Sequence, residues 1–493
     1  MVRLIKKLEL GGVSMARVFL LLFFVFQVGV VSVFATQLEP KQTASFYFKP
    51  FLQKVSQDSI YIVWNNWGLC KAKVEWGKGA LTNSIQVSKE KSRHEAQITG
   101  LEPNTVYNYK VSISGLLCDN DSFSSTFMTA PPADKPFTFL VYGDTRRGIE
   151  QIIPKLPVIE DYFGTTGEGG TNAAHQYVIN GMLSENPRLV VFVGDAGLIG
   201  TQGTVIGEEE FYNWFKIEAP LLSQSVFIPS YGNHEGDLLT GQIDYNLSLF
   251  DEYFVTYANN PNNDETYYSF DYGNSRFIVL NTNQGGDILK SGKPQRSFLE
   301  SELSKASSDK AQGKINHIFL FFHIPIHPSS SGGFFAMPSN VYTEVHNLFK
   351  THKVDIVFQG HIHTYERHYY DGLTYIITGG GGAPISGGAN DADTKSFYQT
   401  LHYLSVTVWG DKIDVMAKRP DGTVLDYFAN YSDSGSGSSG SGGTGGGGGG
   451  EDKDKDKKEG PQAGCSINST YISPLILFVL SLIFMKVRKR KVL

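Results

Sequence analysis

The sequence predicts an α+β protein of more than one domain, in which an N-terminal β-sandwich precedes a larger α/β unit. The chain has 493 residues, which exceeds the length of one ordinary domain. Short runs of alternating apolar and polar residues fill the first part of the chain, as expected for strands joined by turns. After about residue 136, apolar strands alternate with helix-like stretches, which is typical of α/β architecture.

Composition limits the classes of partner. The formal net charge is -6 and only 19% of residues are charged, so the totals indicate neither a nucleic-acid groove nor a basic membrane-binding surface. Aromatic residues make up 13% of the chain, which is typical of a packed, strand-rich globular protein rather than a disordered one. We therefore expect no nucleic-acid partner.

Residues 1–35 have the features of a secretory signal. Basic residues, among them Lys7 and Arg17, precede an apolar run from Val18 to Val33, and small residues near Ala35 offer a cleavage point. Met15 would serve as an alternative start. A retained helical anchor is the competing interpretation, but the small residues at the end of the run favour cleavage and export.

The β-sandwich is predicted over residues 44–131, with strands expected at 59–64, 73–76 and 105–113. The stretch Gly100 to Tyr109 resembles the corner of a fibronectin type III domain, in which a Tyr closes a loop onto the following strand. Cys70 and Cys118 fall within this domain and pair if the chain is exported. Spacing does not give the separation of their Cα atoms, so two free thiols remain an equal alternative.

The α/β unit is predicted over residues 136–430, and each of its apolar strands ends in a polar cluster. Open α/β sheets place their ligands at the carboxyl ends of the strands. The clusters are Gly143-Asp144, Gly194-Asp195, Gly232-Asn233-His234-Glu235, His323 and Gly360-His361-Ile362-His363. Hard cations prefer carboxylate and amide oxygens and borderline cations accept imidazole, so this mixture predicts two neighbouring ions drawn from Fe, Zn or Mn.

From residue 136 to about Pro384 these motifs, in this order, resemble the calcineurin-like metallophosphoesterase superfamily. The preceding sandwich, the run from Gly360 to Arg367 and the later run from Thr378 to Pro384 are similar to the purple acid phosphatase group. The resemblance implies a four-layer α/β/β/α domain and a dinuclear-metal hydrolase of phosphate esters, acting as an acid phosphatase-like phosphomonoesterase. It implies no organic cofactor, and a substrate that is a small phosphate ester or a phosphoprotein.

The resemblance also implies roles for six residues as metal ligands. Asp195 would bridge the two ions, Asp144 and His363 would hold the first ion, and the second ion would be held by Asn233, His323 and His361.

Three further residues are predicted to act on the substrate. His234 would reach the phosphate or leaving group, where a near-neutral imidazole can donate a proton to the departing alkoxide. A role in orienting Asn233 is the alternative. Arg146 would aim its planar donor fork at phosphate oxygens, with a structural ion pair as its alternative. His327 lies four residues after a predicted ligand and is a substrate-facing candidate.

Two positions depart from the purple acid phosphatase pattern. That group carries a Tyr three residues after the bridging Asp, where this chain has Leu198, and other superfamily members carry a His where this chain has Arg146. The first ion would need a further ligand, such as His175 or His327, or water. We expect a colourless protein that holds exchangeable divalent ions, and metal analysis with a visible spectrum tests this. Tight iron with a strong phenolate band would contradict it.

Other residues near these motifs are assigned structural roles. Glu366 and Arg367 are expected to form an ion pair near His363, Tyr365 to be buried with a bonded hydroxyl, and Arg147 to be solvated. The glycines from 379 to 382 lead into Ala-Pro rather than Lys-Ser/Thr, so they are not a P-loop. Close backbone packing or a turn at the rim of the site is expected there instead.

Residues 432–463 are Gly/Ser-rich and then alternate in charge, which predicts a flexible linker. Residues 465–493 hold an apolar run from Ile472 to Met485 followed by a basic cluster, a pattern that predicts a membrane anchor with a cytoplasmic tail. The run is short for a membrane span. It also resembles prokaryotic C-terminal sorting signals, so removal after processing is an alternative. Either way, the body is placed on the outer face of the cell membrane.

Two other functions remain open from the sequence. A phosphodiesterase of nucleotides or phospholipids would use the same pair of ions. A non-catalytic metal-binding surface module would account for the altered first metal site.

Overall fold

The computed structural model describes residues 46–115, 118–147, 168–197, 205–235, 249–283, 289–326, 339–388 and 390–430. The predicted signal (1–35), linker (432–463) and C-terminal segment (465–493) lie outside these ranges, as does His327. Within the described ranges, no helix is both long and apolar enough to span a membrane. The predicted domain boundaries therefore remain predictions, and the account below concerns the folded body.

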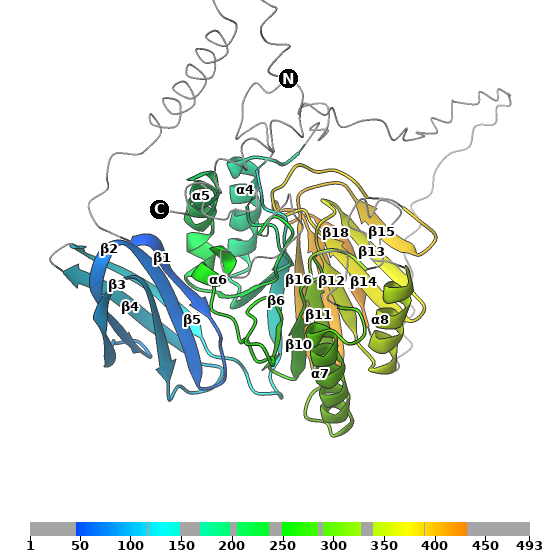
Figure 1. Ribbon diagram of the computed structural model, residues 1–493, viewed down its shortest axis with the longest axis horizontal. Helices are drawn as coiled ribbons and strands as arrows, with labels where there is room; N and C mark the ends of the chain where they lie inside the picture. The colour runs from blue at the N-terminus through cyan, green and yellow to red at the C-terminus, as the bar shows by residue number, and fades with distance from the viewer. Residues whose placement is uncertain are drawn as a thin grey trace, which may run out of the picture. The chain divides into compact units, whose positions relative to one another are not determined.

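Two sheets form the centre of the larger unit (Figure 1). The strands that the first sheet takes from this unit are, in spatial order, β18 (Val424–Ala429), β17 (Lys412–Lys418), β16 (Tyr403–Trp409), β6 (Phe137–Tyr142), β7 (Leu189–Phe192) and β8 (Val226–Pro229). The order of the second sheet is β15 (Thr394–Tyr398), β13 (Tyr365–Tyr370), β14 (Leu373–Thr378), β12 (Ile356–Gln359), β11 (His317–Phe322), β10 (Ser275–Val279) and β9 (Tyr268–Tyr272). The strands that lead to the site, β6 to β8 and β10 to β12, run parallel to their neighbours within each set.

Alternating side chains of these strands build three apolar layers. Phe139 and Val141 of β6 share one buried cluster with Phe319 and Phe321 of β11, so this cluster fills the space between the two sheets. The outer face of the first sheet is covered by α4 (Asn172–Ser184), α5 (Val205–Leu222) and α6 (Leu249–Tyr253). The outer face of the second is covered by α7 (Pro294–Ala311) and α8 (Ser339–Thr351). The predicted four-layer α/β/β/α arrangement is confirmed.

The N-terminal region is a β-rich domain that fits the fibronectin type III pattern. Its strands are β1 (Phe46–Gln53), β2 (Ser59–Gly77), β3 (Asn83–Thr99), β4 (Val106–Gly115) and β5 (Cys118–Met128). The separate strands expected at 59–64 and 73–76 are one long strand, β2, whose pairing with β3 shifts register on either side of Cys70. The first half of β2 pairs with β1 and the second half with β4, so the two halves of this strand have different neighbours.

Two local features of this domain agree with the sequence. The hydroxyl of Tyr107 accepts a hydrogen bond of 2.9 Å from the backbone N–H of Glu102, which closes the corner that the fibronectin-like stretch predicts. Cys70 and Cys118 form a disulfide, so the open alternative between a bridge and two thiols is decided in favour of the bridge. The bridge joins the middle of β2 to the start of β5.

The N-terminal domain packs directly on the first sheet of the larger unit. Leu52 of β1 pairs in parallel with Val226 of β8, which makes the two regions one continuous sheet. The ring of Phe48 stacks on Phe215 of α5 at 4.0 Å between centroids. The buried Tyr109 hydroxyl donates to the Ser223 carbonyl at 2.8 Å. These contacts support a structural role for the domain and bring none of its side chains to the strand ends described next.

Candidate metal centre

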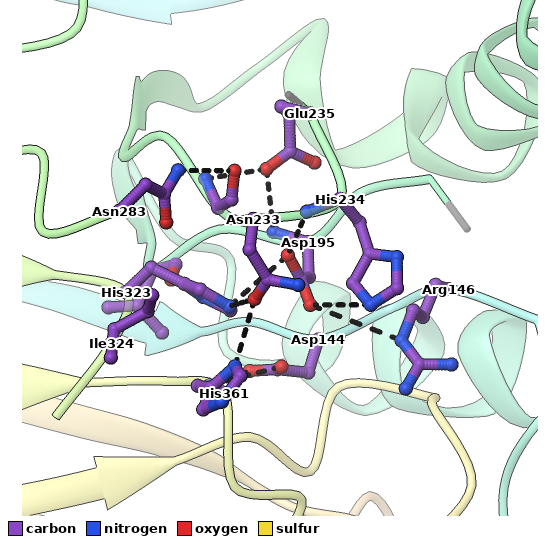
Figure 2. Close-up of polar contacts among 12 residues, drawn as sticks. Asp144, Arg146, Asp195, Asn233, His234, Glu235, Asn283, His323, Ile324 and His361 are labelled. Atoms are coloured by element: carbon purple, nitrogen blue, oxygen red, sulfur yellow. Dashed lines mark hydrogen bonds and ion pairs between the residues drawn. The ribbon is translucent and has the colours of Figure 1, made fainter. Parts of the chain in front are cut away.

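The polar strand ends of the two sheets meet at one place, which Figure 2 shows in close-up. Asp144, Asp195 and Asn233 follow β6, β7 and β8 of the first sheet. His323 follows β11, and His361 and His363 follow β12, of the second sheet. Because each sheet brings the carboxyl ends of neighbouring parallel strands to one edge, residues far apart in sequence are brought together.

Four of these side chains surround a common point. His323 Nε2 lies 2.9 Å from Asn233 Oδ1 and 3.2 Å from Asp195 Oδ1, and His361 Nδ1 lies 2.9 Å from the same Asn233 oxygen. Ligand atoms of Asp195, His323 and His361 all lie within 4.8 Å of one another. We call these four residues the tight set. Their carboxylate, amide and imidazole donors, converging in a buried place, fit a divalent cation.

The hydrogen bonds behind the tight set fix which atoms face that point. His323 Nδ1 lies 2.8 Å from the Val193 carbonyl, so Nδ1 donates and Nε2 is turned toward Asn233 and Asp195. Burial lowers the pKa of His361 to about 3, helped by the charge of His323, which leaves His361 a neutral ligand. Burial opposes a proton on His323, but Asp195 and Asp144 raise its pKa to about 9. That proton lies where a cation would lie.

Asp195 is held as a carboxylate in a fully buried position. Burial raises its pKa, but His323, His234 and Arg146 together bring the pKa well below its usual range. Its Oδ2 lies 3.7 Å from His234 Nε2 and 4.0 Å from Arg146 Nε. The side chains of His234 and Arg146 are partly exposed, at 12% and 16%. An ionised carboxylate with one oxygen toward the tight set and the other toward an imidazole and a guanidinium can link a metal to a bound anion.

Asp144 and His363 form a second, smaller group, which we call the weak pair. His363 Nε2 lies 3.4 Å from Asp144 Oδ1, and His363 Nδ1 donates to the Pro384 carbonyl at 2.7 Å. Both carboxylate oxygens of Asp144 accept the His361 backbone N–H, at 3.1 and 3.0 Å. The weak pair offers one carboxylate and one imidazole for a second cation, with Asp195 as the shared ligand.

Glu235 braces the loops that carry two of the ligands. Its Oε2 accepts the backbone N–H of Gly232 at 2.6 Å and of Asp195 at 2.9 Å, and its Oε1 accepts that of Ala196 at 2.5 Å. Burial and the charge of Asp195 raise the pKa of Glu235 to about 7. The sequence places Glu235 beside Asn233 and His234 but gives it no role. Its hydrogen bonds go to main-chain groups, which residue spacing does not reveal.

Three residues of the site have a backbone conformation that side chains disfavour. The φ angles of Asp144, Asp195 and His361 are 57°, 65° and 71°, in the left-handed region. Such conformations cost about 1–3 kcal/mol each and persist where the surroundings enforce them. Here the enforcing contacts are the main-chain bonds of Asp144 to Gly194 and of Thr145 to Asp195, both close to 3 Å. Strained backbone at three ligands indicates a functional site rather than a simple turn.

The glycine run from 379 to 382 packs against this site at very short range. A Cβ on Gly379 would meet the Ile362 carbonyl oxygen at 2.2 Å, and one on Gly381 would meet the Gly143 carbonyl oxygen at 2.3 Å. Gly381 and Ala383 also donate backbone hydrogen bonds to the carbonyls of Gly143 and Asp144. The expected close packing is confirmed, and its effect is to hold the loop that presents Asp144.

His402 lies behind the same glycines and predicts a pH-dependent stability. Burial lowers its pKa to about 4, while the unfolded chain titrates near 6.5. The unfolded state therefore binds more protons between these values, so stability is lost as pH falls from about 6.5 to about 4, by roughly 3 kcal/mol. We expect His402→Gln to flatten this part of the profile, measured as the thermal unfolding midpoint at steps from pH 7 to pH 4. An unchanged slope would contradict it.

Several sequence-based assignments are corrected by the structure. His175 of α4 does not join the site, because its Nε2 lies 2.7 Å from Oε1 of Glu218 on α5. Arg147 is not solvated, since it forms an ion pair with Glu210 and is 20% exposed. Glu366 and Arg367 do not pair with each other.

Glu366 and Arg367 each bond to a different residue instead. Glu366 bonds to His368 at 2.9 Å, and Arg367 to Asp426 at 2.6 Å. Tyr365 is buried and donates its hydroxyl to the same Asp426 at 2.7 Å, as expected. Leu198 and His327 lie outside the described residues.

Asn283 is a neighbour of the site that the sequence did not single out. It follows β10 and donates from Nδ2 to the Gly232 carbonyl at 2.7 Å, next to Asn233. It is 5% exposed, and its Oδ1 has no hydrogen-bond partner in the part of the chain that the structure describes. Figure 2 shows its contact with the loop that carries Asn233. No motif in the sequence distinguishes this Asn from an ordinary loop residue.

The fold and the site together define a class of protein, a four-layer α/β/β/α domain with a metal-binding cluster of Asp, Asn and His residues at its strand ends. Comparison with known families agrees, since residues 137–365 match the calcineurin-like phosphoesterase family. The chain therefore carries a calcineurin-like phosphoesterase domain, with purple acid phosphatases among its homologues.

Among curated proteins, purple acid phosphatase 23 of Arabidopsis thaliana is 26% identical over 317 residues, covering 59% of this chain and 62% of that protein. The phosphoenolpyruvate phosphatase of Allium cepa is 24% identical over 298 residues, covering 59% of this chain and 54% of that protein. The matches span less than two thirds of the length of these relatives.

Among solved structures, the purple acid phosphatase of yellow lupin (Lupinus luteus) seeds matches with a TM-score of 0.62 and 20% identity. The match covers 77% of this chain and 73% of the lupin chain. The match extends beyond the phosphoesterase domain and supports the fold of the N-terminal domain as well.

Proposed function

We propose that this chain is a metal-dependent hydrolase of phosphate esters that acts as an acid phosphatase-like phosphomonoesterase. The observation that carries the proposal is the tight set, in which Asp195 Oδ1 faces the metal-binding point and Oδ2 faces His234 and Arg146. A phosphate ester needs a cation on its phosphoryl oxygens, a proton donor for its leaving group and positive charge around it. These groups are found within one cluster, and relatives named as phosphatases support the reaction class.

Asp195, Asn233, His323 and His361 would hold one cation, and Asp144 and His363, with Asp195 shared, would hold another. When bound, two such cations lower the pKa of water and neutralise charge on phosphoryl oxygens. The protein itself supplies no nucleophile in this proposal. The ligand set accepts Fe, Zn or Mn.

His234 would act as the proton donor. Its backbone N–H bonds to Asp195 Oδ1 at 3.0 Å, so the main chain anchors the residue independently of its imidazole. The imidazole lies beside Asp195 Oδ2 and is partly exposed, so it can reach both a bound ester and solvent. A proton held on Nε2 would be given to the departing alkoxide.

Arg146 is placed to orient the phosphate. Its guanidinium approaches the same Asp195 oxygen as His234 does. A planar guanidinium donates two parallel hydrogen bonds to phosphate oxygens, which a Lys cannot do in the same geometry. The phosphate would then lie between Arg146, His234 and the cations, with its ester oxygen toward His234.

The proposed location is outside the cell, with attachment to the membrane through residues 465–493 or release after their removal. Support comes from the signal-like residues 1–35, the basic cluster after the apolar C-terminal run and the Cys70–Cys118 disulfide, which suits an oxidising compartment. Brief proteolysis of intact cells that make the full chain tests this. A chain that is protected until the cells are lysed would overturn the location.

The reaction is tested with the purified full-length chain, supplied with Mn, Zn or Fe and assayed on a chromogenic monoester and a chromogenic diester. The monoester is expected to be hydrolysed faster, and Asn233→Ala, which removes one oxygen of the tight set, is expected to lose this activity. Preference for the diester would assign the chain to phosphodiesterases. Wild type as inactive as Asn233→Ala with every metal would indicate a binding module.

A further inference from the structure

The two metal positions of this site are built from unequal numbers of protein ligands. The tight set has four donors: Asn233 Oδ1 lies 2.9 Å from a ring nitrogen of each His, and Asp195 Oδ1 lies 3.2 Å from His323 Nε2. Among the residues that the structure describes, the weak pair has only Asp144 and His363 of its own. The third ligand available to the weak pair is the second oxygen of Asp195, and that oxygen lies beside His234 and Arg146. A cation bound at the weak pair would therefore meet few ligands and the nearby positive charge of Arg146.

Arg146 is positioned to cause this difference. It lies two residues after Asp144 on the same loop, and its Nε is 4.0 Å from Asp195 Oδ2. A guanidinium keeps its charge at any pH compatible with a folded protein and cannot bind a metal. The neighbouring Arg147 does not share this position, because it is turned to Glu210 on α5. The backbone thus directs one arginine into the site and the next one away from it.

We propose that this chain holds one cation tightly at the tight set and a second one only weakly at the weak pair. The guanidinium of Arg146 would supply the positive charge that a second tightly bound cation would otherwise provide. This inference rests on the proposed function and specifies how its metal site is organised. Arg146 would neutralise phosphate and Asp195 together, and the ion at the weak pair would exchange readily with solution.

Replacing Arg146 should strengthen binding of the second metal ion. Loss of a purely structural residue would not have this effect. Arg146→His replaces a cation with an imidazole that can ligate, so the weak pair gains a ligand and loses a repelling charge. Arg146→Ala loses only the charge, so the second ion should bind at least about tenfold more tightly than in wild type. Turnover of a phosphate ester should still fall in Arg146→Ala, because the phosphate loses its donor fork.

The test is metal content of the full-length chain after metal loading and gel filtration, measured by mass spectrometry, with equilibrium dialysis of Zn²⁺ for the second affinity. Wild type is expected to retain one ion per chain and Arg146→His two. Arg147→His is the matched control and is expected to retain one, since position 147 faces Glu210.

Two retained ions of similar affinity in wild type would overturn the inference and leave the proposed function standing. No second ion in Arg146→His, together with no tightening in Arg146→Ala, would also overturn the inference. A wild-type chain that binds no ion under any loading condition would overturn the proposed function itself.

Discussion

Replacing His234 by alanine is expected to lower kcat for a phosphate monoester by about 10²–10⁴-fold, the usual contribution of a positioned general acid. The tight set should survive the substitution, because His234 is anchored to Asp195 through its backbone N–H. Metal content should therefore stay at the wild-type value. The loss should be larger for an alkyl phosphate than for 4-nitrophenyl phosphate, since only the alkoxide needs a proton as it leaves.

The measurement is kcat for both substrates, with metal content determined on the same preparations. His352→Ala is the matched control, because His352 lies ahead of β12, at the strand end opposite the site, and bonds to Ser307. Equal losses for the two substrates would show that His234 binds phosphate without donating a proton. Unchanged kcat for both would remove His234 from the reaction.

Glu235→Gln is expected to weaken metal binding by about 10- to 100-fold, the range seen when groups that orient ligands are lost. The carboxylate accepts backbone N–H groups of Gly232, Asp195 and Ala196. An amide of the same shape turns an NH₂ group toward at least one of these donors, so the loops carrying Asp195 and Asn233 lose their common brace. The backbone at Asp195, already at a φ of 65°, is then free to relax.

The measurement is Zn²⁺ affinity by equilibrium dialysis, with the thermal unfolding midpoint as a check on folding. Glu185→Gln is the control, since Glu185 accepts bonds from Tyr403 and Lys418 at the end of α4, away from the strand ends. Wild-type affinity in Glu235→Gln would show that the loops keep their shape without the brace. Lost affinity in the control as well would point to a general effect of removing charge.

The fold could be predicted from the sequence because the hydrophobic patterns that indicate strands are local and periodic. Apolar strands such as 139–141 and 190–192 end in polar residues, which predicts Asp144, Asp195 and His323 at the carboxyl ends of strands. The length of β2 was not predicted, because the irregular pairing around Cys70 interrupts the alternating pattern and the sequence then indicates two separate strands. The pairing of β1 with β8 joins regions too distant for any local pattern.

The site was predicted where residue type decides the chemistry and missed where geometry does. Asp, Asn and His at strand ends indicate a metal whatever their exact distances. Three contacts depend on the path of the backbone, which residue types do not reveal. They are the hydrogen bonds of Glu235 to the main chain, the pairing of His175 with Glu218, and the ion pair that turns Arg147 away from Arg146. Asn283 was missed for the same reason, since its position beside Gly232 arises only when the two sheets come together.

The most direct test of a metal-dependent phosphoesterase at this site is a crystal structure of the full-length chain grown with Zn²⁺ and phosphate, with anomalous data at the zinc edge. We predict a strong anomalous peak bound by Asp195, Asn233, His323 and His361 at about 2.0–2.2 Å, with a phosphate ion contacting Arg146 and His234. A tight set without zinc, or a phosphate that touches neither Arg146 nor His234, would contradict the account.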